Sequence, residues 1–209
     1  TPTLIVNYGG VNGEYYWYEK TNVWENEKLL KYYPRNIIDS RSRHRTMVPE
    51  EEYENGHILV SKTCKNLSDN GVKVNLGAHG QIQGIGAHWE LWMLQQGGMT
   101  NLEAIRSATL NGAYYIGMDK EIGSLEVGKL ADLIVMDKNP LEDIQNTNSI
   151  VYTMINGRLY DAETMNEIGN YDKPRTKFYW ENNNYNGSFH WHEETNSFMG
   201  GECGCHMAH

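Results

Sequence analysis

The stretch from Val72 to Thr109 constrains the fold more than any other part of the sequence. It opens with a short apolar run at residues 72–76, which predicts a strand, and continues through a glycine-rich loop into an amphipathic segment at residues 87–96. Thr100 and Glu103 have the spacing of a capping box, which marks the start of a further helix. A strand that leads through such a loop into helices predicts an αβ unit, with its reactive side chains where the strand ends.

A second apolar run, at residues 3–6, also predicts a buried strand of a parallel sheet. Acidic residues directly after Pro49 predict the start of a helix that reaches about residue 69. Strand, helix and strand in this order predict two parallel neighbouring strands with the helix crossing over them. His57 and Cys64 fall on the apolar face of this helix, which favours a place in the core over a role as ligands.

The long loop at residues 9–49 is dense in aromatic side chains and carries a local group of basic residues. The aromatic side chains can stack on a substrate or pack the loop onto the rest of the fold. The basic group can bind a substrate carboxylate or pair with nearby acids. These candidates are Tyr15, Tyr16, Trp17, Tyr18 and Trp24, and Arg41, Arg43, His44 and Arg45.

The second half of the chain predicts a small β-rich lobe. Strands are expected at residues 131–136, 150–155 and 158–160. Asn156-Gly157 between the last two is the strongest short signal for a hairpin.

The C-terminal tail has a different character and gathers possible metal ligands. An H-x-H pair on a strand places both imidazoles on one face, and thiolates with imidazoles in a tetrahedral set suit Zn²⁺. The tail therefore predicts a structural zinc site, although a histidine-rich tail without a metal is the alternative. The candidate ligands are His190, His192, Cys203, Cys205 and His206.

Composition excludes some classes of partner. The formal net charge is −9 with the acidic residues spread along the chain, which argues against a nucleic-acid surface. No apolar run approaches the length of a transmembrane helix, so a membrane partner is not expected.

Three motifs together resemble the amidohydrolase superfamily: residues 72–109, the segment GSLEVGKLADLIVMD at residues 123–137, and INGR at residues 155–158. Within it they look like the imidazolonepropionase and prolidase branch, nearest to amidohydrolases fused behind a β-propeller. The resemblance implies an α/β fold, the C-terminal part of a (β/α)8 TIM-like barrel at residues 1–118, a β-sandwich lobe at residues 119–168 and an irregular tail at residues 169–209. A complete barrel needs about 250 residues. The N-terminal part of the barrel is therefore expected as a partner, in the same protein or as a companion chain.

The resemblance also points to a reactive residue. Its members commonly have Gly-Thr-Asp after the last barrel strand, whereas this chain has Gly77-Ala78-His79. An imidazole can bind Zn²⁺ or act as a base, but it cannot bridge two metals as a carboxylate can, so a one-metal site or none is expected. His88 and Glu90 nearby are expected to tie helix to loop.

Two functions follow from these features. The first is a metal-dependent hydrolase, in which a metal-activated water attacks the C–N bond of a small amide, cyclic amide or dipeptide, as part of an oligomer. The second is a non-catalytic metal-binding or assembly module. The resemblance suggests a periplasmic or secreted protein.

Overall fold

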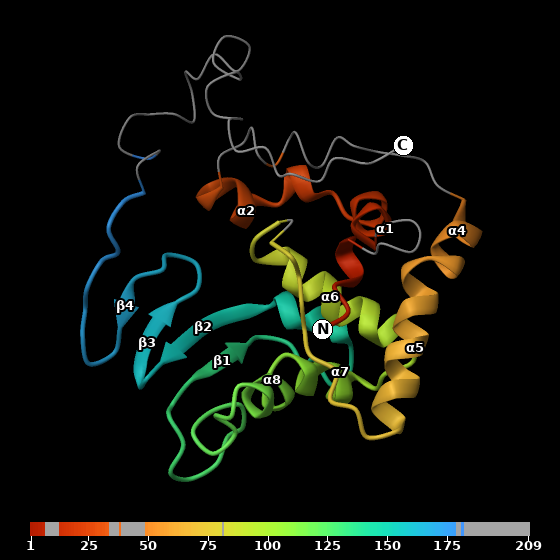
Figure 1. Cartoon of the computed structure of the whole chain (residues 1–209). Helices are drawn as coiled ribbons and strands as arrows, with labels where there is room; N and C mark the ends of the chain where they lie inside the picture. The colour runs from red at the N-terminus through yellow and green to blue at the C-terminus, as the bar shows by residue number, and fades with distance from the viewer. Residues whose placement is uncertain (7–12, 34–37, 39–48, 81, 179–180, 182–209) are drawn as a thin grey trace, which may run out of the picture.

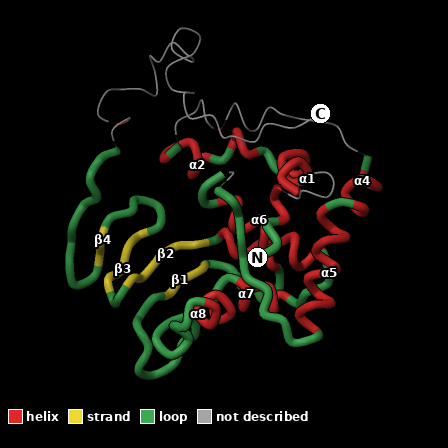
Figure 2. Tube along the Cα trace, in the orientation of Figure 1, coloured by secondary structure: helices red, strands yellow, loops and turns green. Residues whose placement is uncertain are grey.

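The computed structural model describes residues 1–6, 13–33, 38, 49–80, 82–178 and 181. The described residues form a helical body and a small antiparallel sheet that lies to one side of it (Figures 1 and 2). No helix in these ranges is long and apolar enough to cross a bilayer. The helical segments are η1 (Leu4–Val6), α1 (Gly13–Lys20), η2 (Val23–Glu25), α2 (Glu27–Tyr32), α4 (Glu50–Asn55), α5 (His57–Asp69), α6 (Ile85–Gln96), α7 (Asn101–Ser107) and α8 (Leu110–Tyr115).

Helix α6 is the centre of the helical body, with η1, α1, α5 and α7 packed against it. A helix was predicted here, but the prediction that it is amphipathic is wrong. Buried side chains occur all around α6, and even Glu90 is inaccessible. A helix that is apolar on every side is a core helix. Ser61 on α5 shows how close the packing is, since its hydroxyl donates to the Met93 carbonyl at 2.5 Å.

Local sequence signals set the ends of two helices. The predicted capping box is confirmed: the Thr100 hydroxyl accepts from Glu103 N at 3.2 Å, and the Glu103 carboxylate accepts from Thr100 N at 2.7 Å. The single helix expected at residues 50–69 is two helices, α4 and α5, because the chain bends at Gly56, where φ is −95° and ψ is −116°.

Neither apolar run that predicted a parallel strand forms one. Residues Leu4–Val6 make a turn of 3₁₀ helix, and residues 72–78 are extended without a β-ladder, so the predicted pairing between them is wrong. The backbone groups find other partners: Leu4 N donates to a carboxylate on α6, and Leu76 N donates to the Ser107 carbonyl at 2.9 Å. A β-ladder requires a neighbouring strand, and the described residues supply no such strand beside either run. Side chains and helix ends therefore accept the hydrogen bonds of the backbone N–H groups.

The sheet comprises β1 (Leu133–Met136), β2 (Ile150–Ile155), β3 (Arg158–Asp161) and β4 (Glu167–Ile168), in that spatial order. All three pairings are antiparallel. The predicted hairpin is confirmed, and Asn156 and Gly157 at its turn have φ of +49° and +77°. The described residues contain one sheet, so the second sheet that the expected sandwich requires is not among them.

The segment η3 (Ile144–Asn148) lies between β1 and β2 in the chain and joins the sheet to the helical body. Ile144 and Thr147 are buried against α6. The mixture of α and β elements agrees with the predicted α/β class, whereas the parallel barrel strands are not seen in the described residues.

Candidate active-site segment

His79 follows the extended segment at residues 72–78 and precedes α6. Its side chain is exposed, and its φ of +52° lies in the left-handed region. A residue with a β-carbon is destabilised there by roughly 1–2 kcal/mol. Gly80 also has a positive φ, +71°, so two successive residues turn the chain toward α6. Backbone strain at an exposed histidine marks a candidate functional position.

The His79 segment packs closely on the N-terminal residues. A β-carbon at Gly77 would collide with the side chain of Thr1 and lie 3.4 Å from the Thr3 hydroxyl. The two segments expected to be neighbouring strands are therefore side by side, although they share no ladder. Glycine at residue 77 permits this approach.

Glu90 on α6 binds the backbone of the N-terminal residues. Its carboxylate accepts from Leu4 N at 2.9 Å and from Ile5 N at 3.1 Å. Burial raises the pKa of Glu90 to about 7, and the two backbone donors act in the opposite direction because they favour the charged form. Glu90 is thus a structural tie, as expected, but it binds α6 to η1 and not to the loop before α6.

His88 ties α6 to the sheet side of the molecule. Its Nδ1 lies 3.1 Å from the Thr147 hydroxyl on η3, which also accepts from Trp92 Nε1 at 3.0 Å. Burial lowers the pKa of His88 to about 4, so the imidazole is neutral near pH 7. His88 is therefore also a structural tie, but its partner lies on η3 and not on the loop before α6.

The aromatic side chains at the start of the long loop pack into the core. The ring of Trp17 meets Trp92 edge to face at 4.9 Å, and the ring of Tyr18 meets Trp89 at 5.2 Å. Both Trp17 and Tyr18 are buried. The packing alternative is confirmed for these two residues. The basic group at residues 41–45 lies outside the described residues.

His57 and Cys64 on α5 are core residues, as predicted. His57 is fully buried, with Nε2 3.2 Å from Gln96 Oε1, and burial lowers its pKa. Cys64 is also buried, and the loss of hydration raises the pKa of its thiol. Both shifts favour the neutral form, which suits a packing role.

Sequence reasoning missed the role of Lys129, which organises the turn before β1. Its partly buried ammonium donates to the Asp119 carbonyl and to the Ser124 hydroxyl, both at 2.5 Å, and lies 3.3 Å from the Glu126 carboxylate. A depression of about 430 Å³ adjoins it. The ammonium also donates to the Ile122 carbonyl at 3.4 Å, so its three donors hold the turn before β1 together. A lysine directly after a turn glycine was the only sequence signal.

A match to the amidohydrolase family covers residues 43–160, which is more than half of the 209 residues. The chain belongs to the amidohydrolase family. It is 39% identical over 112 residues to a 5'-deoxyadenosine deaminase of Methanobrevibacter smithii, across 51% of this chain and 25% of that protein. It is 54% identical over 39 residues to the imidazolonepropionase of Symbiobacterium thermophilum, across 19% of this chain and 9% of that protein.

Among solved structures, this amidohydrolase chain is similar to a Xaa-Pro dipeptidase with methionine bound in its active site. The identity is 28%, the TM-score is 0.46, and the match covers 61% of this chain and 32% of the dipeptidase. The chain thus spans about a quarter of the deaminase and about a third of the dipeptidase.

Enzymes of the amidohydrolase family commonly depend on a metal. The described residues contain no group of three or more His, Cys, Asp or Glu side chains that could hold a metal ion. His79 would contribute a single ligand, so the described residues alone do not fit a complete metal centre. The five predicted tail ligands lie outside the described residues, and the tail zinc site stays a prediction: His190, His192, Cys203, Cys205 and His206.

Proposed function

We propose that this chain is the C-terminal portion of a metal-dependent amidohydrolase that hydrolyses the C–N bond of a small amide, cyclic amide or dipeptide. Residues 1–118 would complete the barrel, residues 119–168 would form the second lobe, and residues 169–209 would carry the tail. Family membership supports the reaction class. The observation that carries the proposal for this chain is the exposed, left-handed His79 between an extended segment and α6.

The role proposed for His79 follows from its exposure and its chemistry. A neutral imidazole can accept the proton that leaves an attacking water, or donate a lone pair to a metal. Glu90 holds the N-terminal residues in place, and Gly77, two residues before His79, packs against Thr1 of that segment. A zinc ion, when bound, would supply Lewis acidity and lower the pKa of its water.

The chain would act with the rest of an amidohydrolase polypeptide. The described residues hold one candidate ligand near the proposed site, so the others have to come from elsewhere. The relatives are several times longer than the matched segment, which supports a companion segment or chain, and we expect an oligomer.

A non-catalytic metal-binding or assembly module is the second candidate function. The feature in its favour is the spacing of the histidines and cysteines in the tail, from His190 to His206. In that case the histidines and cysteines of the tail would bind the metal, and His79 would have no chemical role.

The first prediction separates these functions in the complete protein. His79→Asn should reduce amide hydrolysis by about 100-fold or more, because positioned acid–base groups contribute roughly 10²–10⁴-fold. Asparagine tolerates the left-handed conformation, so the fold should be kept. The control is Lys73→Ala, on the same extended segment, where the ammonium contacts the Tyr114 ring at 4.3 Å. Turnover would be measured on a panel of dipeptides and N-acyl amino acids. Circular dichroism of each variant would show whether the fold is kept. Full turnover by the His79 variant would remove His79 from the mechanism.

A further inference from the structure

Two parts of the chain that lie outside the family match contact each other in the structure. The match covers residues 43–160, whereas α2 comes before it and the segment that follows β3 comes after it. We call this second segment the C-terminal arm, which comprises the described residues 162–178 and 181. The arm rises from β4 toward α2 beside the sheet (Figure 1).

The first contact joins α2 to the sheet and to the turn after β3. The Lys31 ammonium lies 2.7 Å from the Glu163 carboxylate, and the Tyr32 hydroxyl donates to the Glu163 carbonyl. One turn earlier on α2, the Lys28 ammonium donates to the Ile150 carbonyl at 3.1 Å. These partners are 122 to 132 residues away in the sequence, so α2 is held by a remote part of the chain.

The second contact is centred on Arg175. Its guanidinium lies 5.1 Å from the ring centre of Tyr32 and 4.7 Å from that of Phe178. It also donates to both carboxylate oxygens of Glu181, at 2.7 and 2.5 Å. Arg175 N donates to Asn166 Oδ1 at 3.0 Å, which ties the arm to the turn before β4. We call the four side chains of Tyr32, Arg175, Phe178 and Glu181 the Arg175 latch.

The ion pair of the Arg175 latch is partly shielded from solvent and stays charged near neutral pH. The side chains of Arg175 and Glu181 are only 19% and 21% exposed. Hydrogen bonds from Arg175, and after them the one from Phe178 N, lower the pKa of Glu181 to about 2. A shielded bidentate pair holds its geometry better than an ordinary surface ion pair. Protonation therefore does not open the latch near neutral pH.

Helix α2 depends on such support because it is short. It has six residues, and a helix of this length is not stable by itself in water. The Asn26 side chain caps its start and accepts from Leu29 N at 3.0 Å. Leu29 and Leu30 pack against the hydrophobic core. The helical body therefore supports α2 through its apolar side chains, and the arm supports it through Tyr32.

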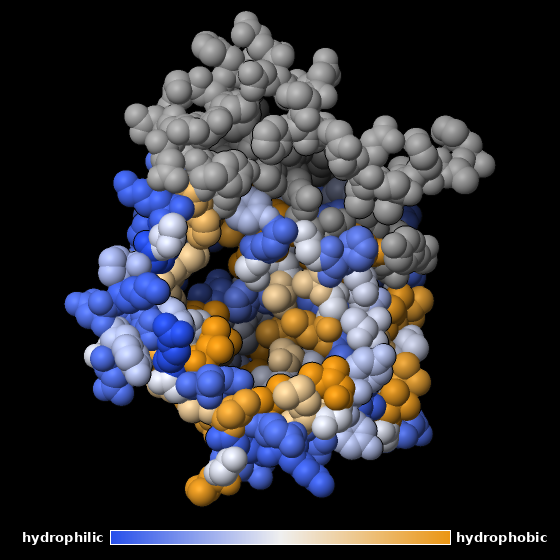
Figure 3. Space-filling model, turned by 60° about the vertical axis from the view of Figure 1, so that its left-hand side comes forward, coloured by the Kyte–Doolittle hydropathy of each residue, from blue (hydrophilic) through white to orange (hydrophobic). Residues whose placement is uncertain are grey.

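The position of α2 connects the arm to the proposed site. Helix α2 lies at the same end of the helical body as the loop between His79 and α6 (Figure 1). The side of the molecule that carries the sheet comes forward in Figure 3, where apolar and hydrophilic surface borders a hollow. Helix α2 also belongs to the long loop at residues 9–49, and loops of this length are commonly functional.

We infer that the C-terminal arm holds α2 through the Arg175 latch at the end of the molecule that carries His79, and that Arg175 is a positioning residue for substrate binding. This rests on the proposed function. The arm acts on α2 and supplies no reacting group, so loss of the latch loosens the binding surface and leaves the chemical step intact. Such a change raises KM and leaves kcat nearly unchanged.

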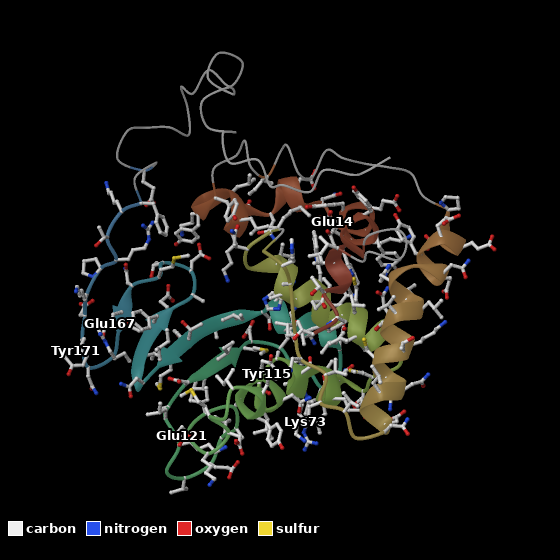
Figure 4. The ribbon with its side chains drawn as sticks, in the orientation of Figure 1. Glu14, Lys73, Tyr115, Glu121, Glu167 and Tyr171 are labelled. Atoms are coloured by element: carbon white, nitrogen blue, oxygen red, sulfur yellow. The ribbon has the colours of Figure 1, made fainter. Side chains whose placement is uncertain are left out.

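The test compares two arginines with similar contacts. Arg175→Ala removes the latch, whereas Arg158→Ala removes a bidentate pair with Glu167 and a contact of 5.9 Å with the Tyr171 ring. Figure 4 shows Glu167 and Tyr171 beside β4 and away from α2. In the complete protein, Arg175→Ala should raise KM for the dipeptide and N-acyl amino acid panel about tenfold, with kcat within about twofold. Arg158→Ala should leave both constants within about twofold of the parent.

Hydrogen exchange gives a readout that does not depend on activity. The amides of α2 should exchange faster in Arg175→Ala than in the parent, and at the parent rate in Arg158→Ala. Arg175→Lys keeps the charge but not the bidentate pair, so it should recover only part of the lost affinity. If Arg175→Ala does not fold, Glu181→Gln is the milder variant, and it should shift exchange and KM in the same direction.

Each outcome bears on the inference. Unchanged exchange in α2, equal effects of the two alanine variants, full recovery by Arg175→Lys, or a loss of kcat without a rise in KM would overturn it. Faster exchange in α2 together with no amide hydrolysis by the parent would uphold the latch and contradict the proposed function. Hydrolysis with a KM that Arg175→Ala leaves unchanged would uphold the proposed function and contradict the positioning role.

Discussion

The helical body and the sheet differ in how they bury apolar side chains. In the helical body, residues such as Trp89, Met93 and Leu94 have no accessible surface. In the sheet, no apolar residue of β1–β4 is buried by the described part of the chain. The comparison teaches that the stability of this chain resides in the helical body, because burial of apolar surface is the main favourable term in folding. In the described residues the sheet is held by its hydrogen-bonded ladder, and its apolar side chains are half-buried or exposed.

The largest effect is expected from the centre of the helical body. Trp89→Ala should destabilise the chain by about 3–5 kcal/mol, because the fully buried indole packs against Tyr18 and leaves a cavity when removed. Ile134→Ala on the half-exposed sheet should change stability by about 0.5 kcal/mol or less. Urea unfolding of both variants measures the difference. Equal losses would contradict the contrast between the two regions.

The next effect concerns the pH dependence of the helical body. The pKa of Glu90 in the folded state, about 7, lies above its ordinary value near 4.5. The folded chain therefore holds a proton that the unfolded chain releases, so stability should fall as the pH rises from about 4.5 to 7 and then level off. The total loss should be about 3 kcal/mol, at about 1.4 kcal/mol for each pKa unit.

The measurement is urea unfolding at several pH values, with Glu90→Gln as the comparison. The variant cannot ionise at this position, so its stability should depend less on pH over this range. A parent chain and a variant with parallel pH profiles would show that Glu90 is not the group responsible.

The smallest effect concerns the connection between the two regions. Thr147→Val removes the oxygen that accepts from Trp92 Nε1 and contacts His88 Nδ1. Buried polar groups that lose a partner destabilise a protein by about 1–3 kcal/mol. Because η3 also packs through Ile144, the variant should stay folded. Compared with the parent chain, hydrogen exchange should accelerate more at the amides of β2 than at those of α5. Uniform acceleration across both regions would contradict a local connection.

Features fixed by neighbouring residues were predictable from the sequence. The capping box at Thr100 and the hairpin at Asn156-Gly157 each depend on a few adjacent residues, and both were predicted at the right place. The core positions of His57 and Cys64 also followed from helical spacing.

Features that depend on distant neighbours were not predictable in the same way. The run at residues 3–6 has a strand composition, but a strand needs a partner, and here the Glu90 carboxylate binds the backbone instead. The amphipathic reading of α6 failed because its polar side chains, Glu90 and His88, point into buried contacts. The role of His79 stays a prediction from the resemblance, while its left-handed backbone was visible only in the structure.

The anchor between Glu90 and the N-terminal residues has a consequence for where this chain can be shortened. A version that began after Ile5 would remove both backbone donors and leave the carboxylate inside an apolar surrounding. A buried carboxyl group without partners either takes up a proton or draws water into the core. Removing the first five residues would therefore disturb α6, the helix against which the other helices pack.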